Sequence, residues 1–101
     1  MSATELFVLK FVARSKGDKH FVGGQRHALL VFVKADSLHD AVSLAPGLLA
    51  ESGWVSPVIR SSRRLATAFV DIADDVLRGA AIDANHNGFA YVAERSPVLD
   101  A

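Results

Sequence analysis

The sequence predicts a single α+β domain in which two helices pack on one face of a mostly antiparallel sheet of four to five strands. Three observations predict this class. The chain has 101 residues, which suits one domain spanning 1–101. Half of the residues are hydrophobic, so a core can form. The apolar residues fall in short runs whose spacing changes along the chain between strand and helix periods.

The first half of the chain begins with two predicted strands, at 5–13 and 27–34. Both runs are rich in aromatic and β-branched residues, and they can pair as an antiparallel hairpin across a polar connection. Alternate residues of the first run are apolar on both faces, apart from Lys10. This pattern predicts either an interior strand or a strand that a partner covers.

A helix is predicted to follow the second strand. Ser37 suits the N-cap, with Asp40 at the third position after it, and Gly53 suits the left-handed residue after the helix. Pro46 lies inside this segment, and its ring clashes with the carbonyl of residue 42. We therefore expect a kink at Pro46, or a short break. The apolar residues at helical spacing are Val42, Ala45, Leu48 and Leu49.

A third strand is predicted over 54–60, and Pro57 places it at a sheet edge or at a strand start. The segment 61–70 fits two patterns. Leu65, Thr67 and Phe69 alternate as in a strand, whereas Leu65, Phe69, Ile72 and Val76 are spaced as in a helix. We expect extended structure to about residue 70.

The second helix is predicted over 71–84, with acidic residues near its N-terminus that suit the helix dipole. The sequence Asn-His-Asn-Gly at 85–88 is a typical helix stop. A last strand is predicted over 89–94, and 94–101 are expected to form a loose tail. The stretch 27–94 then has the βαββαβ order of a two-layer sandwich that is ferredoxin-like or a close variant. The strand at 5–13 does not fit that plan simply.

Composition and charge limit the classes of function. No run approaches the roughly 20 apolar residues that span a bilayer, and no cysteine is present. We therefore expect a cytoplasmic protein. The formal net charge is zero, but residues 1–34 carry +4, from six basic and two acidic side chains, and residues 71–101 carry −4, from two basic and six acidic ones. This asymmetry indicates either attraction within the fold or steering of a partner.

One motif has the spacing of a metal loop. Residues 83–94 match the pattern D-x-[DN]-x-[DN]-G-x5-E and resemble the calcium loop of EF-hand proteins. The resemblance covers 12 of the 101 residues. It implies that Asp83, Asn85, Asn87 and Glu94 would bind calcium through their side chains and Phe89 through its carbonyl. The alternative is a helix-to-strand turn, because Asn and Gly also end helices in the left-handed conformation.

A second candidate site is a groove between the sheet and the kinked first helix. Its predicted lining is Trp54 and His27, with the basic side chains of Arg60, Arg63 and Arg64 nearby. Such a groove would bind a small molecule or an anion, since guanidinium groups recognise phosphate and carboxylate. The alternative is a solvated basic turn.

The leading functional hypothesis is a small bacterial-type interaction or regulatory domain without catalysis, forming a homodimer. This hypothesis depends on the first strand, because its apolar surface is larger than two helices can cover. The alternatives are a small-molecule or calcium-binding protein and a small enzyme of unknown reaction. We expect no cofactor apart from the calcium alternative. The partner is expected to be a second copy or another protein, rather than a membrane or a nucleic acid, because the chain is neutral and lacks paired RNA-binding aromatics.

Overall fold

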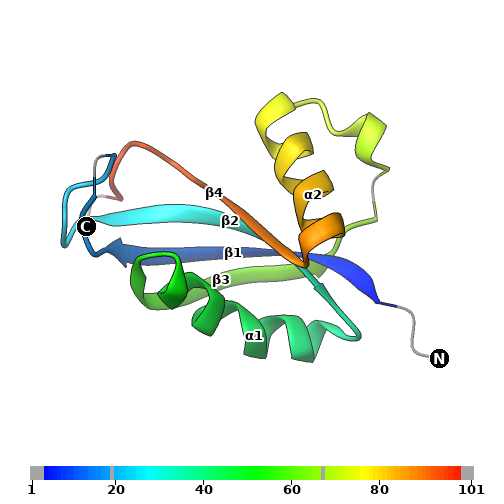
Figure 1. The fold of residues 1–101 in the computed structure, drawn as a ribbon, viewed down its shortest axis with the longest axis horizontal. Helices are drawn as coiled ribbons and strands as arrows, with labels where there is room; N and C mark the ends of the chain where they lie inside the picture. Colours follow the sequence, from blue (N-terminus) through cyan, green and yellow to red (C-terminus); the bar gives the residue numbers. More distant parts are fainter. Residues whose placement is uncertain (1–3, 19, 67, 99–101) are drawn as a thin grey trace.

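The computed structural model describes residues 4–18, 20–66 and 68–98, and its centre is a four-stranded antiparallel sheet. The strands lie in the order β3-β1-β2-β4, so β3 and β4 form the two edges (Figure 1). The α+β class, the antiparallel sheet and the two helices are confirmed. The strands are β1 (Glu5–Ser15), β2 (Arg26–Ala35), β3 (Trp54–Arg64) and β4 (Phe89–Ala93).

The predicted hairpin is formed by β1 and β2, which pair along their whole length from Glu5 opposite Ala35 to Arg14 opposite Arg26. β1 also pairs with β3 on its other side. It is therefore the interior strand that its two apolar faces predicted, and it needs no partner molecule to cover it. The two apolar faces of β1 therefore give no reason to expect a dimer through this strand.

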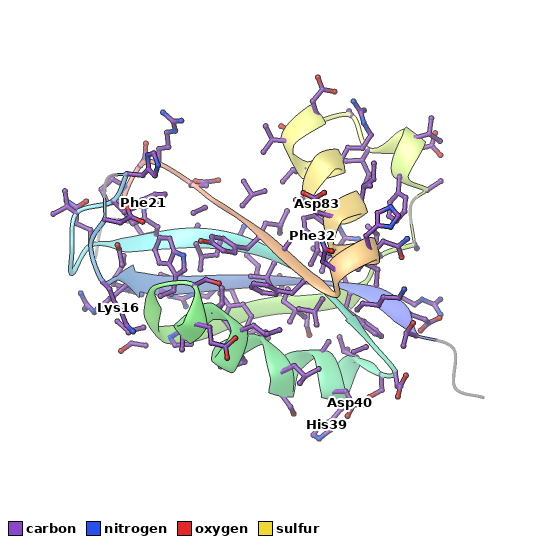
Figure 2. The ribbon with its side chains drawn as sticks, in the orientation of Figure 1. Lys16, Phe21, Phe32, His39, Asp40 and Asp83 are labelled. Carbon is purple, nitrogen blue, oxygen red and sulfur yellow. The ribbon has the colours of Figure 1, made fainter. Side chains whose placement is uncertain are left out.

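The two helices cover opposite faces of the sheet, so the prediction that both lie on one face is wrong. Odd-numbered residues of β1 and β2 pack with helix α1 (Leu38–Glu51) in one core, and even-numbered residues pack with helix α2 (Asp75–Asn87) in another. Figure 2 shows Phe32, a member of the second core, near α2. The physical reason is that both apolar faces of the central strands must be removed from water.

The connections explain how the helices reach different faces. α1 joins β2 to β3, and β1 lies between these two strands. The chain then crosses from the β3 edge to the β4 edge through α2, over the face that α1 leaves open. The segment 61–70 does not supply the extra strand that a βαββαβ order needs. The ferredoxin-like assignment is therefore not established.

Differences from the expected boundaries are concentrated between residues 61 and 75. β3 continues to Arg64, and Phe69–Asp71 form a 3₁₀ turn where extended structure was predicted, while residue 67 lies outside the described residues. α2 begins at Asp75 and ends at Asn87, instead of covering 71–84. The first part of the expected tail is held to the sheet, because the Glu94 and Val98 amides donate to the carbonyls of Ala28 and Arg26. Residues 99–101 lie outside the described residues.

α1 begins as predicted, since the Ser37 hydroxyl accepts a hydrogen bond from the Asp40 amide at 3.1 Å. Gly53 has the expected left-handed backbone, with φ of 94°. The helix continues through Pro46 as one α-helix, so the alternative of a break there is wrong. None of the helices in the described residues is long and apolar enough to cross a membrane.

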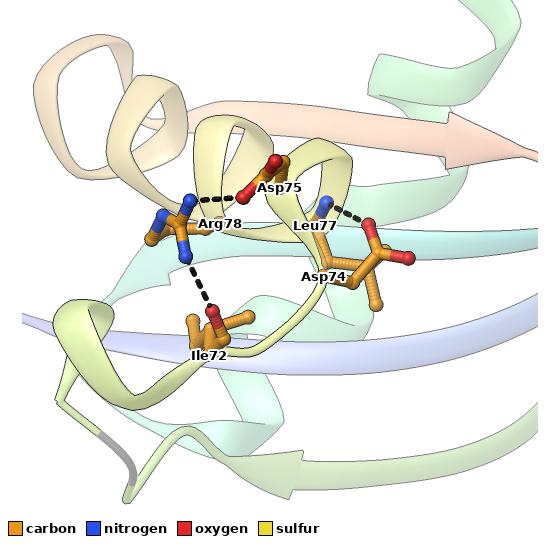
Figure 3. A network of polar contacts seen from close by, with 5 residues as sticks. All are labelled: Ile72, Asp74, Asp75, Leu77 and Arg78. Atoms are coloured by element: carbon orange, nitrogen blue, oxygen red, sulfur yellow. Dashed lines mark hydrogen bonds and ion pairs between the residues drawn. The ribbon is translucent and has the colours of Figure 1, made fainter.

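The start of α2 is held by a small polar network (Figure 3). The Asp74 carboxylate accepts a hydrogen bond from the Leu77 amide at 3.0 Å, which makes Asp74 the N-cap. The Arg78 guanidinium donates to the Ile72 carbonyl at 2.8 Å and also pairs with Asp75. These contacts fix the angle at which the chain passes from the 3₁₀ turn into α2.

Candidate functional site

Two of the predicted groove residues do meet, but they fill a core instead of lining an open groove. The rings of His27 and Trp54 are 5.8 Å apart, and both side chains are buried, with exposed fractions of 1% and 2%. Phe21 packs edge-on against both rings, and Tyr91 packs edge-on against Trp54. This aromatic cluster closes one end of the face that α1 covers.

Phe21 reaches the aromatic cluster from the loop between β1 and β2 (Figure 2). The loop is shaped by Asp18, whose carboxylate accepts hydrogen bonds from the amides of His20 and Phe21 at 2.7 and 2.9 Å. These two backbone hydrogen bonds lower the pKa of the Asp18 carboxyl, because they favour its charged form. The loop therefore holds Phe21 in a defined place beside the sheet.

The three arginines are not gathered near Trp54. Arg64 lies at the far end of β3 and pairs with Glu5, with 3.2 Å between the guanidinium nitrogen and the carboxylate oxygen. Arg63 is opposite Val8, on the face that α2 covers, and the register shift between Ser61 and Ile59 leaves Arg60 at a bulge. The predicted groove of Trp54, His27 and three arginines is therefore not formed.

The calcium loop is not formed either. Asp83, Asn85 and Asn87 belong to the last turns of α2, and Phe89 belongs to β4. A helix followed by a strand does not wrap its side chains around one ion as a calcium loop does. In the part of the chain that the structure describes, no group of three acidic or histidine side chains is placed to hold a metal. Gly88, with φ of 93°, makes the helix-to-strand turn that was the alternative.

The two edges of the sheet differ sharply. β3 carries several features that discourage pairing with another strand: Pro57, which has no amide hydrogen, two register shifts, and the positive φ of 52° at Ser56. Its far end also carries three arginines. β4, with the sequence Phe-Ala-Tyr-Val-Ala, has no charged residue, no proline and no register shift in its pairing with β2.

The hydrogen-bond pattern shows which backbone groups of β4 point outward. The Glu94 amide donates to the Ala28 carbonyl, and the Gly88 carbonyl accepts from the Lys34 amide. Antiparallel pairing alternates, so the even-numbered residues of this stretch bond to β2. Phe89, Tyr91 and Ala93 therefore direct their amides and carbonyls to the open edge. Within the described residues, these outward groups have no hydrogen-bond partner.

A concavity of about 530 Å³ lies beside this open edge. Tyr91 and Ala93 of β4 form part of its lining, Phe21 and His20 of the β1–β2 loop flank it, and Arg95 lies at the end of the strand. Val76 of α2, whose side chain is 64% exposed, completes the lining. An extended segment placed in this concavity would lie along β4.

The sequence predicted β4 as a strand but did not show that it is an edge. Its neighbours are decided by the crossing of α2, which no local pattern reveals. No local pattern marked it as an edge, because its five residues include neither the charge nor the proline that edge strands usually carry. Comparisons with protein-family models, with curated proteins and with solved structures found no match for this chain.

Proposed function

We propose that this chain is an interaction domain without catalysis, and that it associates by accepting a further strand at the open edge of β4. In solution this association takes the form of a homodimer. The observation that carries the proposal is the row of amides and carbonyls at Phe89, Tyr91 and Ala93 that have no hydrogen-bond partner among the described residues. An exposed sheet edge of this kind is a template for another strand, and main-chain hydrogen bonds supply the affinity.

The contrast between the two edges supports a functional reading of β4. Proteins that must stay monomeric blunt their edges with proline, charge or bulges, and β3 carries all three. β4 carries none of them, although five half-buried apolar residues at an edge are a risk for uncontrolled aggregation. A specific partner that covers this edge removes the risk.

The test uses Ala93, because its amide points outward and its side chain is small. In Ala93→Pro the outward amide hydrogen is lost and the ring obstructs an approaching strand, whereas the hydrogen bonds from β4 to β2 are kept. We expect wild-type protein to dimerise in a concentration series measured by light scattering. Ala93→Pro should weaken the dimer by at least about tenfold in Kd, because each symmetric contact loses a hydrogen bond.

The matched control is Ala93→Ser, which keeps the amide and a side chain of similar size. It should dimerise as well as the wild type does, and circular dichroism should show that both variants are folded. A wild-type chain that stays monomeric at the highest concentration would overturn the proposal. So would an Ala93→Pro variant that is folded and dimerises normally.

A further inference from the structure

We infer that the strand that adds to β4 is β4 of a second copy, in a two-fold register centred on Tyr91. This inference rests on the proposed function and specifies its partner and geometry. In this register the two Tyr91 residues face each other, and Phe89 of each copy faces Ala93 of the other. The four-stranded sheets of the two copies would then join at β4 into one continuous antiparallel sheet.

Symmetry is the first argument for a second copy. The outward residues are Phe89, Tyr91 and Ala93, and Tyr91 is their midpoint. A two-fold axis at Tyr91 exchanges Phe89 with Ala93, so each outward amide of one copy faces an outward carbonyl of the other. Each facing pair can exchange two hydrogen bonds, as hydrogen-bonded pairs of antiparallel strands do. No outward group is left without a partner.

Side-chain size is the second argument. All three outward-bonding residues carry side chains on the face that α1 covers, where they pack against the first core. On this face, a large side chain of one copy lies opposite a small side chain of the other, because each Phe89 ring faces an Ala93 methyl. The two Tyr91 rings lie side by side, and aromatic pairs across strands are favourable. Phe21 and Ala93 line the same concavity, so Phe21 would flank the incoming Phe89 ring.

Charge is the third argument. The chain has a formal net charge of zero, so two copies approach without long-range repulsion. In this register the chain that follows Ala93, which carries the exposed Arg95, lies next to the end of α2 in the second copy. Asn87 is the last residue of α2, where the helix dipole is negative, and Asp83 lies one turn earlier. A basic side chain thus meets a negative helix end at both ends of the interface.

The test is disulfide cross-linking, which suits this chain because it contains no cysteine. Facing residues of a hydrogen-bonded pair have Cα atoms about 5.5 Å apart, within the roughly 4.4–6.8 Å range of disulfides. Tyr91→Cys should therefore cross-link to itself under mild oxidation. Phe89→Cys and Ala93→Cys should not cross-link to themselves, because like positions are four residues apart along the strands, about 14 Å at 3.4 Å per residue. A mixture of these two variants should cross-link to each other.

Val70→Cys is the control for random collision, since Val70 is 82% exposed and lies in the 3₁₀ turn away from β4. We expect the Tyr91→Cys dimer to form at least about tenfold faster than the Val70→Cys dimer. A dimer in light scattering with self-cross-linking at Phe89→Cys or Ala93→Cys would overturn the register but leave the proposed function standing. A monomer, with every cysteine reacting at the rate of Val70→Cys, would overturn both.

Discussion

At the scale of single residues, His27 shows how a polar ring is held in an apolar core. Its Nδ1 donates to the Glu94 carbonyl at 2.7 Å, because a carbonyl can only accept. In the described residues its Nε2 is buried and has no hydrogen-bond partner. The ring packs edge-on against Phe21 and Trp54, and these contacts offset the cost of the unpaired nitrogen. His27 thus ties the end of β4 to the start of β2.

Removing this ring should destabilise the fold. His27→Ala loses the hydrogen bond to Glu94 and leaves a cavity between two aromatic rings, so we expect the free energy of unfolding to fall by about 2–4 kcal/mol. Urea denaturation measures this change. The control is His20→Ala, at an exposed histidine of the β1–β2 loop, which should change stability by less than about 0.5 kcal/mol. Equal values for the two variants would contradict a structural role for His27.

At the scale of elements, α1 tolerates a proline that the sequence pattern predicted would kink or break it. Pro46 lies in the ninth position of a helix that runs from Leu38 to Glu51. Its nitrogen has no hydrogen, so the Val42 carbonyl loses its helical donor. The helix forms because Ala41, Ala45 and Leu49, all with 0% exposure, bury one side against the sheet. Tertiary packing outweighs the local penalty.

Restoring the missing hydrogen bond should stabilise the helix. Pro46→Ala returns an amide donor to Val42, and we expect the free energy of unfolding to rise by about 1–3 kcal/mol. The comparison is Gly47→Ala, where an added Cβ has no atom within 4 Å. That variant should gain about 1 kcal/mol from helix propensity alone. If Pro46→Ala is less stable than the wild type in urea denaturation, the proline ring makes packing contacts that outweigh the hydrogen bond.

At the scale of the whole molecule, the sheet separates two cores. The core beside α1 contains Leu49, and the core beside α2 contains Phe32 and the small residues Ala80, Ala81 and Ala84. The small residues let α2 approach the sheet closely. The same arrangement leaves β4 at an edge, because α2 delivers the chain to the side of β2 away from β1.

Separate cores predict additive changes in stability. Leu49→Val and Phe32→Leu each remove part of a buried side chain and should each cost about 1 kcal/mol. Since the two side chains lie on opposite faces of the sheet, the double variant should equal the sum of the single variants within about 0.5 kcal/mol in urea denaturation. A larger deviation would show that the two cores act as one.

The sequence by itself determined the elements whose signals are local. Runs of aromatic and β-branched residues located β1 and β2, the Ser37 cap located the start of α1, and Gly88 located the turn before β4. The arrangements that its two site hypotheses require are not formed in the described residues. The calcium pattern is satisfied by a helix end and a strand, and Trp54 and His27 meet inside a core.

Only the tertiary structure decided which face each helix covers and which strands lie at the edges. An apolar strand face looks the same in the sequence whether a helix of its own chain or a second molecule covers it. The open edge at Phe89, Tyr91 and Ala93 is set by the path of α2 across the sheet. That path depends on burying both faces of β1 together, a requirement that involves residues far apart in the chain.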